Sequence, residues 1–157
     1  MALEIERKFL VKKGINISSL GKTVEIIQGY LSSIKERTVR VRIKGNKAFL
    51  TIKGVSNESG VSRYEFEKEI SLIEAKELLE LCEKPILRKT RTNVKVGSHI
   101  FEIDKFLLEN EGLIIAEVEL NNENELFEKP SWLGKEVTGD IKYYNSNLLK
   151  NPYKNWK

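Results

Sequence analysis

The chain has 157 residues, of which 40% are hydrophobic and 32% are charged, and its formal net charge is +4. This length fits a single domain over residues 1–157, and the apolar fraction is enough for a hydrophobic core, which argues against global disorder. A net charge this small, with no block of like charge, makes nucleic acid an unlikely partner.

The lone cysteine, Cys82, excludes an intramolecular disulfide and a thiolate metal cluster. No apolar run is long enough to span a bilayer, and the first residues lack the apolar core of a signal peptide. We therefore expect a cytoplasmic protein with no membrane partner. Nothing in the pattern indicates an oligomeric state.

Apolar and polar side chains alternate with a period of two along most of the chain, which predicts about eight strands. The predicted strands cover 2–11, 23–33, 37–45, 47–55, 61–70, 86–96, 99–107 and 113–121. Short turns at Gly45-Asn46, 56–60 and Gly97-Ser98 join several of them, and such turns are typical of antiparallel hairpins.

A helix interrupts the strands after the fifth of them. Ser71 followed by Glu74 is a capping-box pattern, in which the serine side chain and the glutamate side chain bond each other's backbone amide. The pattern predicts a helix over 72–83, ending before Pro85.

The last third of the chain carries weaker helix signals. Asn122 with Glu125 resembles a second capping box, and predicts a short helix that ends before Pro130. A third short helix is expected over 144–150, and 129–142 is expected to be an ordered loop. The fold class is therefore mainly β, with peripheral helices.

Nearly every predicted strand has one apolar face and one charged face. In the first strand, Glu4, Glu6 and Lys8 share a face, because alternate side chains point to opposite sides. The charged positions of the later strands are Arg40, Arg42, Lys44, Lys53, Arg63, Glu65, Glu67, Glu69, Lys89, Arg91, Glu102, Asp104, Glu117 and Glu119. The first, fifth, seventh and eighth strands are mainly acidic, and the third, fourth and sixth are basic.

An antiparallel sheet with one side in water would explain any single strand of this kind. The pairing of charges in almost every strand, and their segregation by sign, favour another arrangement. About eight antiparallel strands can close into a barrel, and the charged faces would then line a tunnel with an acidic and a basic wall.

A tunnel of this kind predicts its own ligands. Carboxylates such as Glu4 and Glu6 offer hard oxygen ligands that suit Mg²⁺ or Mn²⁺, whereas arginine and lysine bind phosphate oxygens. Together these groups are typical of a phosphoryl-transfer site that acts on a small polyanion.

The same residues resemble a known family. Glu4-Ile-Glu6-Arg-Lys8 is similar to the ExExK signature of CYTH domains, also called triphosphate tunnel metalloenzymes. Further elements follow in the family's order: Val-Arg40-Val-Arg42, Thr51-Ile-Lys53, Arg63-Tyr-Glu65-Phe-Glu67, Lys89-Thr-Arg91, Glu102-Ile-Asp104 and Glu117-Val-Glu119. Trp132-Leu-Gly-Lys135-Glu-Val-Thr and Asp140-Ile-Lys142-Tyr143 resemble the family's closing segment, so the resemblance covers essentially the whole chain.

The resemblance implies a closed eight-stranded antiparallel barrel with a charged interior, and hydrolysis of a linear triphosphate with Mg²⁺ or Mn²⁺. By position, the implied metal ligands are Glu4, Glu6 and Glu119, with Glu117 and Asp104 as further candidates, and these five with Lys8 form the catalytic set. The implied triphosphate-binding residues are Lys8, Arg40, Arg42, Lys53, Lys89 and Arg91, with Arg63, Lys135 and Lys142 as additional candidates. Glu65 and Glu67 are expected on the acidic wall, where they would hold water or brace the basic residues.

The primary hypothesis is hydrolysis of inorganic tripolyphosphate to pyrophosphate and phosphate, with nucleoside triphosphates as further substrates. Class IV adenylate cyclases and thiamine triphosphatases of the same family are enzyme alternatives, and Trp132, Tyr64 or Trp156 could stack on a base. A polyphosphate- or nucleotide-binding module is the non-enzyme alternative. A sheet-surface interaction protein, with the charged faces outside, is the last one.

Overall fold

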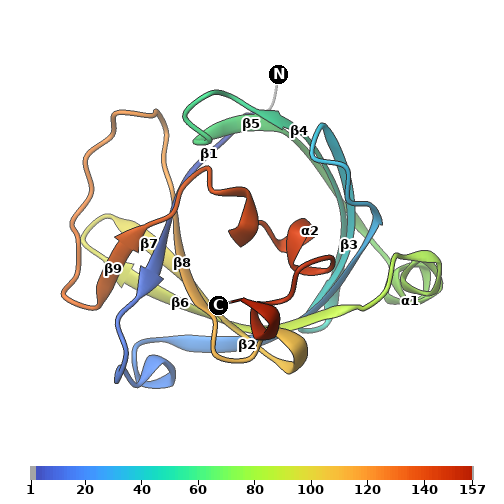
Figure 1. Ribbon diagram of the computed structural model, residues 1–157, viewed down its shortest axis with the longest axis horizontal. Helices are drawn as coiled ribbons and strands as arrows, with labels where there is room; N and C mark the ends of the chain where they lie inside the picture. The colour runs from blue at the N-terminus through green and yellow to red at the C-terminus, as the bar shows by residue number, and fades with distance from the viewer. Residues whose placement is uncertain (1–2, 157) are drawn as a thin grey trace.

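The computed structural model describes residues 3–156, and antiparallel strands dominate that range (Figure 1). The strands are β1 (Leu3–Val11), β2 (Lys22–Ser32), β3 (Arg37–Lys44), β4 (Lys47–Ser56), β5 (Ser62–Ile70), β6 (Leu87–Val96), β7 (His99–Phe106), β8 (Ile114–Glu119) and β9 (Leu133–Glu136). The eight strands predicted from the alternating pattern are confirmed, although residue 2, the first of the predicted range, lies outside the described residues.

Strands β1 to β8 form a closed barrel, as expected. The order of hydrogen-bonded neighbours is β5-β4-β3-β2-β6-β7-β8-β1, and β1 pairs with β5 to complete the ring. Figure 1 shows this ring of strands. The register places Glu6 opposite Glu119, and Lys8 and Glu102 opposite Glu117, so charged side chains of three neighbouring strands meet on the inner face.

A ninth strand, β9, lies beside β1 outside the ring, where the sequence predicted only a loop. The prediction of a loop was wrong, because the local pattern did not show that this edge of β1 needs backbone partners beyond Lys8. Strand β9 supplies them, pairing Phe9 with Glu136 and Val11 with Leu133.

Most of the hydrophobic core lies on the outer faces of the strands. Helix α1 (Leu72–Leu81) covers β2, β3 and β4 from outside, where Ala75 packs with Val41 and Ala48. A larger cluster on the outer faces of β1, β6, β7 and β8 surrounds Phe101 and Trp132. The apolar faces of the strands therefore point outward, and the charged faces point into the barrel.

Helix α1 begins at Ser71 with both bonds of the predicted capping box, and it ends at Leu81. The helix predicted after Asn122 is absent from the described chain. Glu125 accepts a hydrogen bond from the amide of Asn121, and the turn that begins at Asn121 ends before Glu125 without continuing into a helix. Beyond it the chain extends, which allows Phe127 to pack edge-on against Phe9 and Phe101.

The C-terminal segment enters one end of the barrel, where Figure 1 shows it inside the ring. It contains η3 (Ile141–Tyr143), the short helix α2 (Asn145–Leu148) and η4 (Tyr153–Asn155), so the helix predicted over 144–150 is confirmed in part. Leu148 and Leu149 pack against inward-facing residues such as Phe106. Two further 3-10 turns, η1 (Ile17–Ser19) and η2 (Leu108–Asn110), lie in connections.

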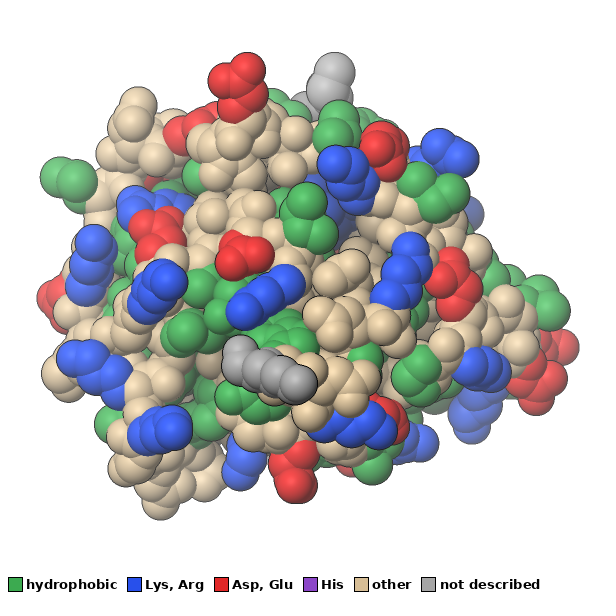
Figure 2. Space-filling model, in the orientation of Figure 1, with side chains coloured by type: hydrophobic (Ala, Val, Ile, Leu, Met, Phe, Trp, Pro, Cys, Tyr) green, Lys and Arg blue, Asp and Glu red, His purple; other side chains and the backbone are tan. Residues whose placement is uncertain are grey.

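On the face shown in Figure 2, acidic and basic side chains are interspersed over the surface. Within residues 3–156, no helix combines the length and the apolar character needed to cross a bilayer.

Candidate active site

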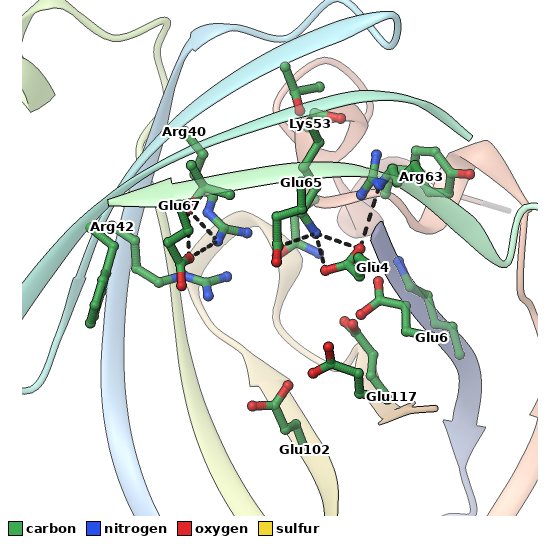
Figure 3. A pocket seen from close by; sticks show the side chains of 18 of the residues that line it. Glu4, Glu6, Arg40, Arg42, Lys53, Arg63, Glu65, Glu67, Glu102 and Glu117 are labelled. Atoms are coloured by element: carbon green, nitrogen blue, oxygen red, sulfur yellow. Dashed lines mark hydrogen bonds and ion pairs between the residues drawn. The ribbon is translucent and has the colours of Figure 1, made fainter. Parts of the chain in front are cut away.

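The barrel encloses a polar cavity of about 220 Å³. Its lining contains fifteen of the charged strand residues singled out from the sequence: Glu4, Glu6, Lys8, Arg40, Arg42, Lys44, Lys53, Arg63, Glu65, Glu67, Lys89, Arg91, Glu102, Glu117 and Glu119. Figure 3 shows how the labelled members converge from β1, β3, β4, β5, β7 and β8 onto one space. Residues spread over more than a hundred positions therefore form a single site.

The basic wall is centred on Arg40 and Arg42 of β3. The Arg42 guanidinium is buried and donates from Nε to Gln28 Oε1 at 2.9 Å. Burial, together with the positive charges of Arg40 and Arg91, lowers the pKa of Arg42 to about 9. Among residues 3–156, Arg40 Nε has no hydrogen-bond partner although it is buried. The wall thus holds mutually repelling cations and an unused donor, which suits an anionic ligand.

Lys89 and Arg91 of β6 complete the basic wall. Burial and the nearby Arg91 and Arg42 lower the pKa of Lys89, and Asp104 opposes that shift. Lys89 Nζ contacts Asp104 Oδ2 and Asn145 Oδ1, each at 2.7 Å. Asn145, from α2, was not predicted as a site residue, because neither its type nor its spacing distinguishes it in the sequence.

The contacts of Asp104 differ from those expected of a metal ligand and catalytic residue. Its side chain is fully buried and is absent from the cavity lining. Oδ1 accepts from Arg91 Nε at 2.7 Å, and Oδ2 accepts from Arg91 Nη2 at 2.9 Å. With Lys89 also bonded, both oxygens are occupied, so Asp104 braces two basic side chains. The strand pattern shows which face of the strand Asp104 lies on, but not that its partner Lys89 is also bonded by Asn145 of the C-terminal segment.

The acidic wall consists of Glu6, Glu102, Glu117 and Glu119. Glu117 lies deep in the barrel, and burial together with the charge of Glu6 raises its pKa. Burial and the charges of Glu4 and Glu6 likewise raise the pKa of Glu119. Carboxylates crowded in this way repel one another, and a cation among them would relieve the repulsion.

Glu4 lies where the two walls meet. Lys53 Nζ donates to both of its oxygens, at 2.9 and 2.7 Å, and Arg63 Nε lies 3.7 Å from Oε1 (Figure 3). Lys53 also lies 3.6 Å from Glu65 Oε2, and Arg40 lies 3.6 Å from Glu67 Oε1. Glu65 and Glu67 therefore brace basic side chains, which is one of the two roles expected of them.

Within the described range, no three carboxylate, imidazole or thiolate groups converge closely enough to form a closed metal site. The donor set nevertheless fits a hard divalent cation, because Glu6, Glu117 and Glu119 offer carboxylate oxygens that form no salt bridge with any residue in the range 3–156.

Two predicted substrate-binding residues lie elsewhere. Lys135 is exposed on β9, outside the ring of strands. Lys142 is exposed on η3, with Nζ 4.5 Å from the ring centroid of Trp156. Neither lines the cavity. The cavity lining instead includes Tyr30, Thr38, Lys44, Phe49, Thr51, Tyr144, Asn145 and Ser146, which the sequence did not single out as ligands.

A family model described as "CYTH domain" matches residues 2–150. The chain belongs to the CYTH family. A relative from Acetivibrio thermocellus named inorganic triphosphatase is 52% identical to this CYTH protein over 158 residues, covering 100% of this chain and 99% of the relative. A relative of the same name from Nitrosomonas europaea is 35% identical over 149 residues, covering 92% of this chain and 95% of the relative.

Solved structures agree on the fold. A crystal structure of an inorganic triphosphatase superposes on this CYTH chain with a TM-score of 0.64 and 34% identity, covering 93% of this chain and 97% of that one. A putative adenylate cyclase from Bacillus halodurans has a TM-score of 0.60 at 21% identity, covering 78% of this chain and 84% of that one. The second similarity shows the shared barrel alone.

Proposed function

We propose that this CYTH protein is a divalent-metal-dependent triphosphatase that hydrolyses inorganic tripolyphosphate to pyrophosphate and phosphate. The observation that carries the proposal is a single cavity with a basic wall and an acidic wall facing each other. Two relatives named inorganic triphosphatase, matched over almost their whole length, support the choice of substrate.

The basic wall would bind the phosphate chain. Arg40 and Arg42 present planar guanidinium groups that suit pairs of phosphate oxygens, and Lys8 and Lys53 add point charges. A phosphate oxygen beside Arg40 would give its orphaned Nε an acceptor. A polyanion would also offset the repulsion that lowers the pKa of Arg42. The site thus favours a ligand with several negative charges close together.

The acidic wall would hold the metal. Glu6, Glu117 and Glu119 are the proposed ligands of Mg²⁺ or Mn²⁺, and Glu4 could join them by exchanging its bond to Lys53. When bound, the metal would supply positive charge that neutralises the phosphate chain. The attacking water needs a carboxylate in the cavity to accept its hydrogen bond, and of the two further candidates, Glu117 and Asp104, only Glu117 lines the cavity. We therefore assign that role to Glu117, acting as a hydrogen-bond acceptor.

Glu6→Gln tests the metal site. The variant should lose nearly all metal-dependent phosphate release while its circular dichroism spectrum stays that of the wild type. Glu77→Gln, an exposed glutamate on α1, is the matched control and should keep full activity. Near wild-type turnover in Glu6→Gln would refute the assignment.

The substrate is tested by offering tripolyphosphate, ATP and thiamine triphosphate, each with Mg²⁺ and with Mn²⁺. Phosphate release should be fastest from tripolyphosphate. Cyclic AMP as the main product from ATP would instead establish a cyclase, and tight binding without turnover would establish a binding module.

A further inference from the structure

The barrel closes through a short seam beside the residues of the ExExK strand. Strand β5 pairs with β1 only from Leu3 to Ile5, and the amide of Glu6 then bonds Val61 O at 3.0 Å. Strand β9 takes over this edge of β1 at Phe9. Lys8, a proposed ligand of the phosphate chain, lies in the gap between the two partner strands.

Thr138 fills that gap. The backbone amide of Lys8 donates to Thr138 Oγ1 at 2.9 Å, and the amide of Val137 donates to Lys8 O at 2.8 Å. A side-chain hydroxyl thus replaces the strand partner that the Lys8 amide would otherwise have. Lys8 is buried, so its amide has no alternative partner in bulk water.

A second contact holds the Thr138 hydroxyl in place. Thr138 Oγ1 donates to Glu136 Oε2 at 2.6 Å, which directs its lone pairs toward the Lys8 amide. Glu136 in turn accepts from Arg7 Nε at 2.8 Å and from Arg7 Nη2 at 2.6 Å. The Arg7 guanidinium also makes a cation–π contact, 5.1 Å from the ring centroid of Phe127. The hydroxyl is therefore oriented by a charged pair on the outside of the barrel.

The next residue anchors this segment to the opposite side of the seam. Gly139 lies against Gly60 of the β4–β5 loop so closely that a Cβ on Gly60 would lie 2.3 Å from Gly139 Cα. A small cavity beneath this contact is lined by Thr138 together with Glu4, Glu6 and Lys8. The segment that holds Lys8 thus bridges both edges of the seam.

We propose that Thr138 is a positioning residue for the ExExK strand, acting through the Lys8 amide and oriented by Glu136 and Arg7. The inference rests on the proposed function, because it assigns Thr138 to the binding of triphosphate by Lys8. Thr138 makes no contact with the reacting atoms in this assignment. It sets the position of the backbone from which Lys8 reaches the cavity.

The test compares Thr138→Val, which keeps the shape and removes the hydroxyl, with Thr138→Ser, which keeps the hydroxyl. We expect the KM for tripolyphosphate to rise about tenfold in the valine variant, the scale of one hydrogen bond, and to return to within about twofold of wild type in the serine variant. Assays are run well below the measured Tm of each variant. A merely structural role would lower Tm without moving KM, and that result would overturn the proposal.

A double-mutant cycle tests whether Lys8 is the intermediary. Calorimetric binding of tripolyphosphate in EDTA should weaken in Thr138→Val, but the same change in a Lys8→Ala background should have no further effect. An equal loss in both backgrounds would overturn the assignment to Lys8. Should Thr138→Val not fold, Glu136→Gln takes its place, with a smaller rise in KM expected.

Hydrogen exchange of the Lys8 amide separates this inference from the proposed function, because it needs no substrate. Exchange should accelerate by about tenfold or more in Thr138→Val and stay near the wild-type rate in Thr138→Ser. Unchanged exchange in the valine variant would overturn the role of Thr138. If the wild type neither binds nor hydrolyses tripolyphosphate, the proposed function fails, whatever the exchange rates show.

Discussion

Asp104→Asn should be among the most destabilising single substitutions in the barrel. The change removes the negative charge that faces Lys89 and Arg91, and all three side chains are buried. Breaking a buried ion pair typically costs about 3–5 kcal/mol, because the remaining charge stays desolvated and uncompensated. For a domain whose total stability is on the order of 5–15 kcal/mol, the loss is a large fraction.

Urea unfolding at pH 7, followed by circular dichroism, measures this loss. Glu102→Gln is the matched control, because Glu102 Oε2 lies 3.3 Å from Arg91 Nη1 but its side chain is 37% exposed. Removing that charge should cost less than about 1 kcal/mol. Tripolyphosphate in EDTA should stabilise Asp104→Asn more than the wild type, since the polyanion would compensate the freed cations.

The contribution of Asp104 to the free energy of unfolding depends on pH with a definite sign. Burial alone would raise the pKa of Asp104, but Arg91 and Lys89 hold it well below its usual range. A carboxyl whose pKa is lowered by folding contributes stability above its unfolded pKa of about 4, and loses it as the pH falls further. The stability that the Asp104 carboxylate contributes should therefore be lost below about pH 4, where the gap between wild type and Asp104→Asn should narrow.

The reasoning would be refuted if Asp104→Asn unfolded like the wild type but needed more Mg²⁺ for the same activity. That outcome would make Asp104 a metal ligand, as the resemblance to the family implied.

Three further predictions concern residues outside the acidic and basic walls of the main cavity. Ser71→Ala removes the N-cap of α1 and should lower stability by about 1 kcal/mol in urea unfolding, with unchanged activity. Gly60→Ala should lower Tm strongly, because φ is +77° and the new Cβ would clash with Gly139; Gly97→Ala, at φ +61° with open space around it, is the control and should lower Tm much less. Cys82 should react with a thiol reagent far more slowly than free cysteine, because it is 5% exposed and burial raises its pKa; rapid labelling of the folded protein would contradict this.

The strands and their faces were predictable because period-two alternation is local. Each of the eight strands needs only its own residues to show which side chains share a face. The failures came where a segment depends on distant partners. Strand β9 forms because β1 has an unpaired edge, and the predicted helix after Asn122 is replaced by extended chain that packs Phe127 on the outer core.

The site residues were likewise predictable where they lie on strands and unpredictable where they lie in other segments. Apart from Glu69 and Asp104, the residues of the predicted charged strand faces were placed correctly in the cavity, from Glu4 to Glu119. Lys135 and Lys142 were not, because no alternating strand pattern ties their segment to the barrel interior. Asn145 was missed, since an amide on a short helix becomes a partner of Lys89 only when that helix enters the barrel.

By itself, the sequence determined that eight strands each carry a charged and an apolar face, because side-chain direction in a strand follows from backbone geometry alone. It also determined which strands are acidic and which are basic. Only the tertiary structure decided that the charged faces point inward, that Asp104 is buried behind Lys89 and Arg91, and that Thr138 completes the seam beside Lys8. These features depend on the order and register in which distant strands pair, and no local pattern encodes them.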